Sequence, residues 1–269
     1  MYKWLRFNQR DGLNLGSICR STEEESRADG GMTMDGQRKR QRMQPMVAFH
    51  ALKALVANPQ DTPKVFDVIR ALGGPSLERG LRRFRTTDFG NQVLTDDIDI
   101  LETLQNRSML EALPTGSFGS AYYQFTHREA LAADGLVDAS AIEAESLSDP
   151  QLVRYGTRLR DTHDLWHTLT GYGRDELGEA CLLAFTYAQT RNRGIFVIAI
   201  VGGFKLRQAM GPGVFRALLR AYRDGRQAAW LPAVHLESLL GQPITDVRTQ
   251  LRIPEPVPYR ALIAAYAAS

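Results

Sequence analysis

Apolar residues recur three or four positions apart through most of this chain, and this spacing constrains the fold more than any other feature. One such stripe spans residues 47–56 and a second spans 65–72. The second follows DTP at 61–63 and ends before GG at 73–74, which are typical helix boundaries. No segment shows a convincing alternation of apolar and polar residues, as a half-buried strand would. We therefore predict an all-α fold.

The same periodicity predicts eight further helical segments and no internal repeat. They lie at about 75–85, 96–112, 118–132, 149–169, 175–192, 194–203, 213–224 and 233–240. The longest apolar run, IFVIAIV at 195–201, is far shorter than the roughly 20 residues that span a bilayer. We interpret this run as a buried core helix, within a single domain that covers residues 46–269.

The composition changes near residue 45. The preceding segment is charged, contains several glycines and has almost no aliphatic residues, so it cannot bury enough surface to offset the entropy lost on ordering. We predict that residues 1–45 form a disordered tail. Its basic run at 38–42, RKRQR, is a solvated linker or a contact for an anionic surface.

Charge and cysteine content exclude several classes of protein. A formal net charge of +3 is too small to predict binding to nucleic acid. The two cysteines, Cys19 and Cys181, are too far apart for a CxxC motif and predict no disulfide framework. The N-terminal sequence lacks the apolar core of a secretory signal, and the acidic run at 23–25 argues against a mitochondrial presequence. These features predict a cytoplasmic, reducing environment.

Two histidines and a glutamate have the spacing of metal ligands. His163 and His167 are four residues apart and share one helix face, and Glu179 follows on the next predicted helix. Two imidazoles and a carboxylate suit catalytic Zn²⁺ and equally the facial triad of Fe²⁺. Asp164 points about 100° away around the helix, so it is either a fourth ligand or a partner that orients a histidine. The alternative is that both histidines face solvent or satisfy hydrogen bonds within the core.

Two other metal-enzyme patterns fit poorly. A zincin protease needs glutamate in HExxH, whereas this chain has the shorter Asp164. A phosphohydrolase of the HD type needs a further upstream histidine, for which His127 is the candidate, and a late aspartate.

The string His163-Asp164-Leu-Trp-His167, followed by eleven residues and Glu179, resembles the signature of the ubiquinone (coenzyme Q) biosynthesis protein 4 family. The resemblance extends from Met46 to Ile253. It includes LPTGSFG at 113–119 with Tyr122 after it, AYRDGRQA at 221–228, LE at 236–237 and PITDVRTQL at 243–251.

This resemblance implies an all-helical, membrane-peripheral protein that acts on polyprenylated ring intermediates of ubiquinone synthesis. It implies that His163, Asp164, His167 and Glu179 hold a divalent metal, with Zn²⁺ expected first and Fe²⁺ or another ion as alternatives. The associated reaction removes the C1 carboxylate of a 4-hydroxybenzoate derivative, with hydroxylation at the same carbon. The alternative is a non-catalytic, lipid-binding organiser of the pathway's other enzymes. The expected location is the inner-membrane surface, and a homodimer stays open.

Three residues near the motif are candidate substrate ligands. Arg158 and Arg160 precede His163 by about one helical turn, and a guanidinium binds a carboxylate in a fork, although a salt bridge is as good an interpretation. Tyr172 is a candidate donor to the ring hydroxyl, with a packing role as the alternative.

Two basic segments are candidates for membrane contact. Residues 76–85 place leucines and a phenylalanine at helical spacing beside four arginines, a pattern typical of an interfacial helix. Residues 216–226 carry four arginines around Leu218, Leu219 and Tyr222. The alternative for both is a core helix with a solvated basic face.

Overall fold

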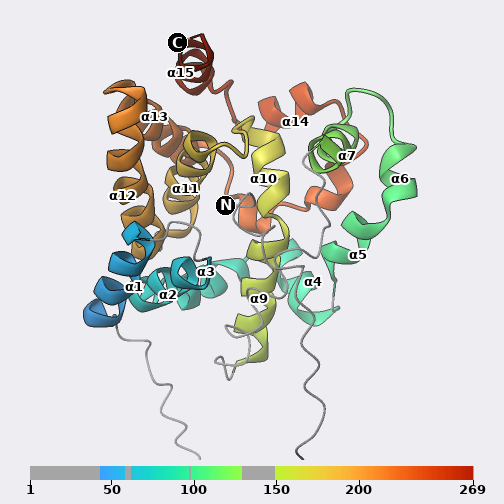
Figure 1. The fold of residues 1–269 in the computed structure, drawn as a ribbon. Helices are drawn as coiled ribbons and strands as arrows, with labels where there is room; N and C mark the ends of the chain where they lie inside the picture. The colour runs from blue at the N-terminus through green and yellow to red at the C-terminus, as the bar shows by residue number, and fades with distance from the viewer. Residues whose placement is uncertain (1–42, 58–61, 97, 129–148, 269) are drawn as a thin grey trace, which may run out of the picture.

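The computed structural model describes residues 43–57, 62–96, 98–128 and 149–268. Within these ranges the chain forms 14 α-helices and no β-strand (Figure 1), which confirms the all-α prediction. The predicted tail falls almost entirely in residues 1–42, outside the described residues. The helices are α1 (Pro45–Ala57), α2 (Thr62–Gly73), α3 (Ser76–Phe84), α4 (Asp88–Thr95), α5 (Ile100–Gln105), α6 (Arg107–Glu111), α7 (Phe118–Arg128), α9 (Pro150–Asp161), α10 (His163–Thr170), α11 (Glu176–Thr190), α12 (Arg193–Met210), α13 (Gly213–Gln227), α14 (Ile244–Leu251) and α15 (Val257–Ala267).

Several helix boundaries differ from those predicted. The segment 96–112 forms two short helices because Asn106 ends α5 and its side chain caps α6. The segment 149–169 divides at Thr162, whose buried hydroxyl donates to the carbonyl of Arg158 at 2.8 Å. Residues 233–240 include two 3₁₀ turns, η2 (Leu231–Ala233) and η3 (Leu236–Leu239). Helices α4, α14 and α15 were not predicted.

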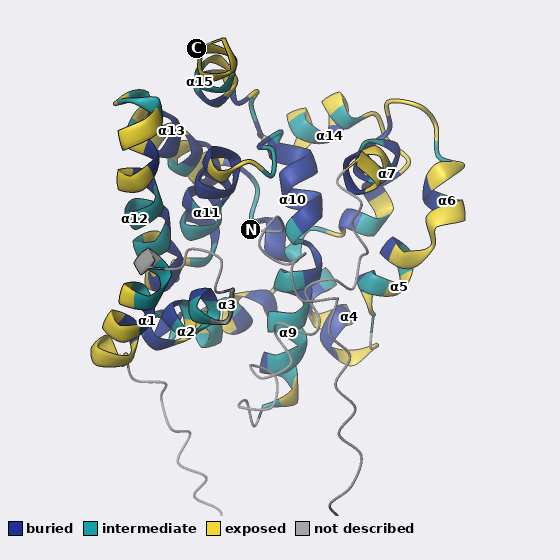
Figure 2. Ribbon diagram, viewed as in Figure 1, coloured by how far each residue is buried: buried dark blue, intermediate teal, exposed yellow. Residues whose placement is uncertain are grey.

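Helix α10 lies at the centre of the fold, between α11 on one side and α7 on the other (Figure 1). All its residues except His163 are buried, as its dark colour in Figure 2 shows. The main hydrophobic core surrounds it and draws on α7, α11, α13 and α14. A helix in this position can hold polar side chains only if they bind one another or a ligand.

The basic segment 76–85 corresponds largely to α3, whose apolar face is occupied by the protein itself. Leu81 and Phe84 are buried in a second, smaller core together with Tyr155 of α9. The arginines at 79, 82 and 83 are exposed. The alternative of a core helix with a solvated basic face therefore describes α3.

Helix α12 contains the apolar run at 195–201, and the prediction that this run is buried is wrong for one of its faces. Phe196 is 43% exposed, whereas Ile195 and Ala199 are buried. The reason is that α2, α11 and α13 all pack against one side of α12, and its other side faces outward (Figure 2). Among the described helices none has the length and apolar character needed to cross a bilayer.

Candidate metal centre

Helix α10 brings both predicted histidines to one point. The ring centroids of His163 and His167 lie 4.8 Å apart with the rings at 69° to each other. Together with the Asp164 carboxylate they form a group whose ligand atoms all lie within 4.8 Å of one another. The four-residue spacing therefore produces the shared face that the sequence predicted.

Asp164 belongs to this cluster, although its position on the helix suggested that it would turn away. Its Oδ1 lies 3.4 Å from Nδ1 of His163, and its side chain is 6% exposed. Neighbouring residues start about 100° apart around a helix, and the length of the imidazole closes that gap. A carboxylate is thus available beside the two imidazoles on the same helix.

Glu179 lies beside His167, although outside the group of three residues whose ligand atoms all lie within 4.8 Å, because the chain reverses tightly after α10. Gly171 has φ of 73°, a left-handed conformation that favours glycine and ends α10. Asp175 begins α11 by accepting a hydrogen bond from the amide of Gly178 at 2.9 Å. A Cβ at Gly178 would lie 2.1 Å from the carbonyl oxygen of Gly173, so only glycine permits this approach. Glu179 then stands in the first turn of α11.

The backbone of the reversal fixes the orientation of the His167 ring. Nδ1 of His167 lies 3.0 Å from the carbonyl oxygen of Tyr172. Because a carbonyl can only accept, Nδ1 carries a proton and donates it. Nε2 is then directed at Glu179, whose Oε2 lies 3.4 Å away. This arrangement leaves Nε2 as the ring nitrogen that could bind a metal.

Burial and the ion pair determine the charges of this pair. Burial alone raises the pKa of Glu179, but the attraction of the His167 ring outweighs it and holds the pKa of that carboxyl well below its usual range. Burial alone lowers the pKa of His167, and the Glu179 carboxylate reverses this and raises it. Without metal, a proton on His167 therefore neutralises Glu179.

The residues present fit a divalent metal. His167 Nε2 is buried, and among the described residues it has the Glu179 carboxylate 3.4 Å away but no hydrogen bond within the usual criteria. An ion between the helices would satisfy both groups. Imidazole and carboxylate donors suit Zn²⁺ and Fe²⁺ alike, so the donor set leaves both metals open.

The predicted substrate ligands lie in other surroundings. Arg158 is buried and forks onto Glu237, with N–O distances of 2.8 and 3.0 Å, so the salt-bridge alternative describes it. Arg160 donates from Nε to Asp161 at 2.7 Å. Tyr172 is part of the main core, where burial raises the pKa of its hydroxyl. Its contribution to the site comes from its backbone carbonyl.

Two further residues support the site and were not predicted. The ring of Phe125 on α7 stacks on His167, with centroids 5.6 Å apart. Arg248 on α14 donates to the carbonyls of Leu169 at 2.8 Å and Thr168 at 3.2 Å, near the carboxyl end of α10. The sequence carried no signal for either contact, because each depends on how distant helices meet.

Sequence comparison finds relatives of this chain among ubiquinone biosynthesis proteins. A ubiquinone biosynthesis protein COQ4 homologue of Aedes aegypti, named as mitochondrial, is 32% identical over 199 residues, which cover 71% of this chain and 70% of the relative. A COQ4 homologue of Culex quinquefasciatus, also named as mitochondrial, is 31% identical over 214 residues, with 76% and 72% covered.

The fold and the family model point the same way. The crystal structure of a protein from Nostoc punctiforme PCC 73102 superposes with a TM-score of 0.56 at 18% identity, covering 80% of this chain and 100% of that one, which shows a shared fold. The family described as coenzyme Q (ubiquinone) biosynthesis protein Coq4 matches residues 38–257. This chain is therefore a ubiquinone biosynthesis protein that belongs to the Coq4 family.

Proposed function

We propose that this protein is a metal-dependent lyase that removes the C1 carboxylate of a polyprenylated 4-hydroxybenzoate derivative, coupled to hydroxylation at C1. Membership of the Coq4 family supports the pathway. The observation that carries the catalytic part is the buried cluster of His163, Asp164 and His167, which Glu179 adjoins. A lipid-binding organiser has no evident need for such a cluster.

The cluster residues and Glu179 have distinct tasks. His163, His167 and Glu179 would hold the ion, and Asp164 would either complete the set or orient His163. When bound, the ion supplies positive charge that stabilises negative charge developing on the substrate. The Tyr172 carbonyl keeps the proton of His167 on Nδ1, so that Nε2 stays a ligand.

The substrate itself favours the reaction. Once ionised, its 4-hydroxyl raises the electron density at C1, the para carbon. Molecular oxygen is the oxidant and first bonds to C1. The bond from C1 to the carboxylate then breaks and CO₂ leaves, while its electron pair forms the C1=O bond as the O–O bond breaks and the outer oxygen departs as hydroxide. The product therefore carries its new oxygen at C1 as a quinone, the two-electron-oxidised form of the C1-hydroxylated ring. The buried surroundings of the cluster strengthen electrostatic stabilisation relative to water.

A polyprenylated substrate also implies a location and partners. The prenyl tail partitions into a bilayer, and no described helix can span one. The protein therefore works at the membrane surface on the inner-membrane side, and passes its product to other enzymes of ubiquinone synthesis.

The test is turnover by purified protein loaded with Zn²⁺ or Fe²⁺, using a short-prenyl 4-hydroxybenzoate derivative and no partner enzymes. We expect CO₂ release and, under ¹⁸O₂, labelled product by mass spectrometry. His163→Ala should abolish both, whereas His50→Ala, at an exposed histidine outside the cluster, should not. If the wild type binds the substrate but converts none of it with either metal, the organiser alternative is correct.

A further inference from the structure

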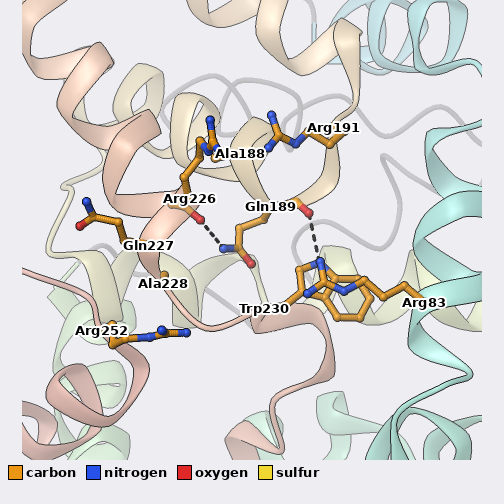
Figure 3. A pocket seen from close by; sticks show the side chains of 10 residues that line it. Arg83, Ala188, Gln189, Arg191, Arg226, Gln227, Ala228, Trp230 and Arg252 are labelled. Carbon is orange, nitrogen blue, oxygen red and sulfur yellow. Dashed lines mark hydrogen bonds between the residues drawn. The ribbon is translucent and has the colours of Figure 1, made fainter.

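Four arginines from distant parts of the chain surround an open cavity of about 720 Å³ (Figure 3). Arg83 comes from α3, Arg191 follows α11, Arg226 belongs to α13 and Arg252 follows α14. We call this cavity the arginine pocket. Among the described residues that line it, none is acidic.

The positive charge of the arginine pocket is not neutralised within the part of the chain that the structure describes. None of the four guanidinium groups forms an ion pair there with a carboxylate. Asp224 of α13 is two residues from Arg226 but forms its ion pair with Arg220, whose Nε lies 2.7 Å from Oδ1 of Asp224. Four cations that face one space repel one another, and this repulsion favours binding of an anion.

Two of these arginines have a left-handed backbone conformation. Arg191 and Arg252 have φ of 58° and 57° and are the only non-glycine residues with positive φ among those described. Each ends a helix at the position where glycine is favoured, and a side chain there carries a conformational cost. Both exceptions line the same pocket, so a role for the two guanidinium groups would explain why glycine is absent.

The floor of the pocket is held in place by Gln189. Its amide donates to the carbonyl of Gly225 at 2.6 Å and accepts from the backbone of Leu231 at 2.9 Å. The backbone carbonyl of Gln189 accepts a hydrogen bond from the indole N–H of Trp230 at 3.1 Å. With its polar groups satisfied, the floor is fixed before any ligand arrives.

Two of the arginines are also held in position. The guanidinium of Arg83 lies over the ring of Trp230, 4.2 Å from its centroid. Arg191 donates to the hydroxyl of Tyr222 at 3.1 Å. Neither contact uses all the donors of a guanidinium, which has five, so each arginine keeps donors for a ligand.

We propose that the arginine pocket binds a phosphate-bearing anion with two or more negative charges. Planar guanidinium groups pair with phosphate oxygens in two-point contacts, and several of them suit a diphosphate or a phosphomonoester. The phosphate belongs either to a soluble ester or to the headgroup of an anionic phospholipid. This site is separate from the metal centre, whose ligands line no part of it.

Isothermal titration with inorganic diphosphate, in buffer free of divalent ions, tests the proposal. The double variant Arg191→Gly, Arg252→Gly removes two guanidinium groups and relieves both left-handed positions. We expect roughly 100-fold weaker binding, about tenfold for each arginine, together with an unchanged or higher melting temperature. The charge-matched control, Arg216→Ala with Arg223→Ala on exposed positions of α13, should bind like the wild type.

Two further measurements locate the site and its natural source of phosphate. Diphosphate should shift the amide NMR signals of Gly225 and Ala228, which line the pocket, and leave those of Gly171 and Gly173 unchanged, because the candidate metal centre is elsewhere. Vesicles of phosphatidylcholine with phosphatidic acid should displace diphosphate if the phosphate is a lipid headgroup, and should fail to displace it if the ligand is soluble. The proposal is overturned if the wild type does not bind diphosphate. It is also overturned if the double variant binds diphosphate as tightly as the wild type, or if the charge-matched control loses as much affinity as the double variant.

Discussion

The candidate metal centre and the arginine pocket both gather ionisable side chains, but the two regions balance charge in opposite ways. In the candidate metal centre, His167 is completely buried and faces a carboxylate of opposite charge. In the arginine pocket, all four side chains are exposed and carry the same charge. Water stabilises an exposed cation, whereas a buried charge needs a partner. Burial therefore decides which group of residues tolerates the loss of one member.

The largest effect should follow removal of one partner in the buried pair. His167→Ala leaves Glu179 charged and alone in the core, so the free energy of unfolding of the metal-free protein should fall by about 3–5 kcal/mol. Metal content should fall as well, because the ligand atom is lost. Urea unfolding and metal analysis of the purified variant measure the two effects.

A double variant separates the two contributions. In His167→Leu with Glu179→Leu no charge is stranded, so the loss of stability should be smaller than in His167→Ala, while metal binding stays absent. If the double variant is less stable than His167→Ala, the pair stabilises the protein through packing of the two side chains and not through their opposite charges.

The next effect in size concerns the reversal that delivers Glu179. Gly178→Ala places a Cβ 2.1 Å from the carbonyl oxygen of Gly173, so the backbone must shift. We expect a loss of about 2 kcal/mol and weaker metal binding. Gly202→Ala on α12 is the matched control, since its Cβ would meet nothing within 4 Å. That variant should gain about 0.5–1 kcal/mol from better helix propensity, as thermal unfolding can show.

Acid should weaken the metal-free protein through the same pair. The pKa of Glu179 is lower in the folded state, so its stabilisation is full above the unfolded value of about 4.3 and disappears as the pH falls below it. His167 behaves in reverse, because its raised pKa gives stability that is lost as the pH rises through its folded value. In Glu179→Gln, unfolding measured from pH 6 downward should show a flatter acid dependence.

The smallest effect on stability should come from salt. Between roughly 0.1 and 1 M NaCl the Debye length falls from about 10 Å to about 3 Å. The buried pair is shielded from salt, so the stability difference between wild type and His167→Ala should change by less than about 0.5 kcal/mol. Diphosphate binding in the exposed arginine pocket should weaken by about tenfold over the same range. Equal sensitivity in both measurements would erase the contrast between the two regions.

Local sequence patterns predicted the parts of the fold that depend on local structure. The spacing of His163 and His167 fixes their shared face on one helix, and the glycines that follow permit the reversal to Glu179. Features that depend on how distant helices pack together were not predicted. The apolar run in α12 could not show that Phe196 faces outward, because exposure depends on how many neighbouring helices cover a face.

The arginine pocket shows the same limit more sharply. Arg191 and Arg252 are 61 positions apart, and each alone resembles an ordinary surface arginine. Their shared left-handed backbone appears only after each helix end is placed in space. Likewise, the fork of Arg158 onto Glu237 joins residues far apart in sequence, so the spacing before His163 suggested a substrate ligand instead.

The hydrogen bond from His167 to the Tyr172 carbonyl has a dynamic consequence. It ties the tautomer of a buried ring to a peptide group in the reversal that begins at Gly171. Whenever that reversal opens transiently, the ring loses the acceptor that holds its proton on Nδ1. A local opening equilibrium therefore sets the fraction of time for which the His167 ring keeps this orientation. Amide hydrogen exchange at Gly171 and Gly173 reports that equilibrium. Slow exchange at these two amides would mark a centre that keeps its shape between successive encounters with its ligand.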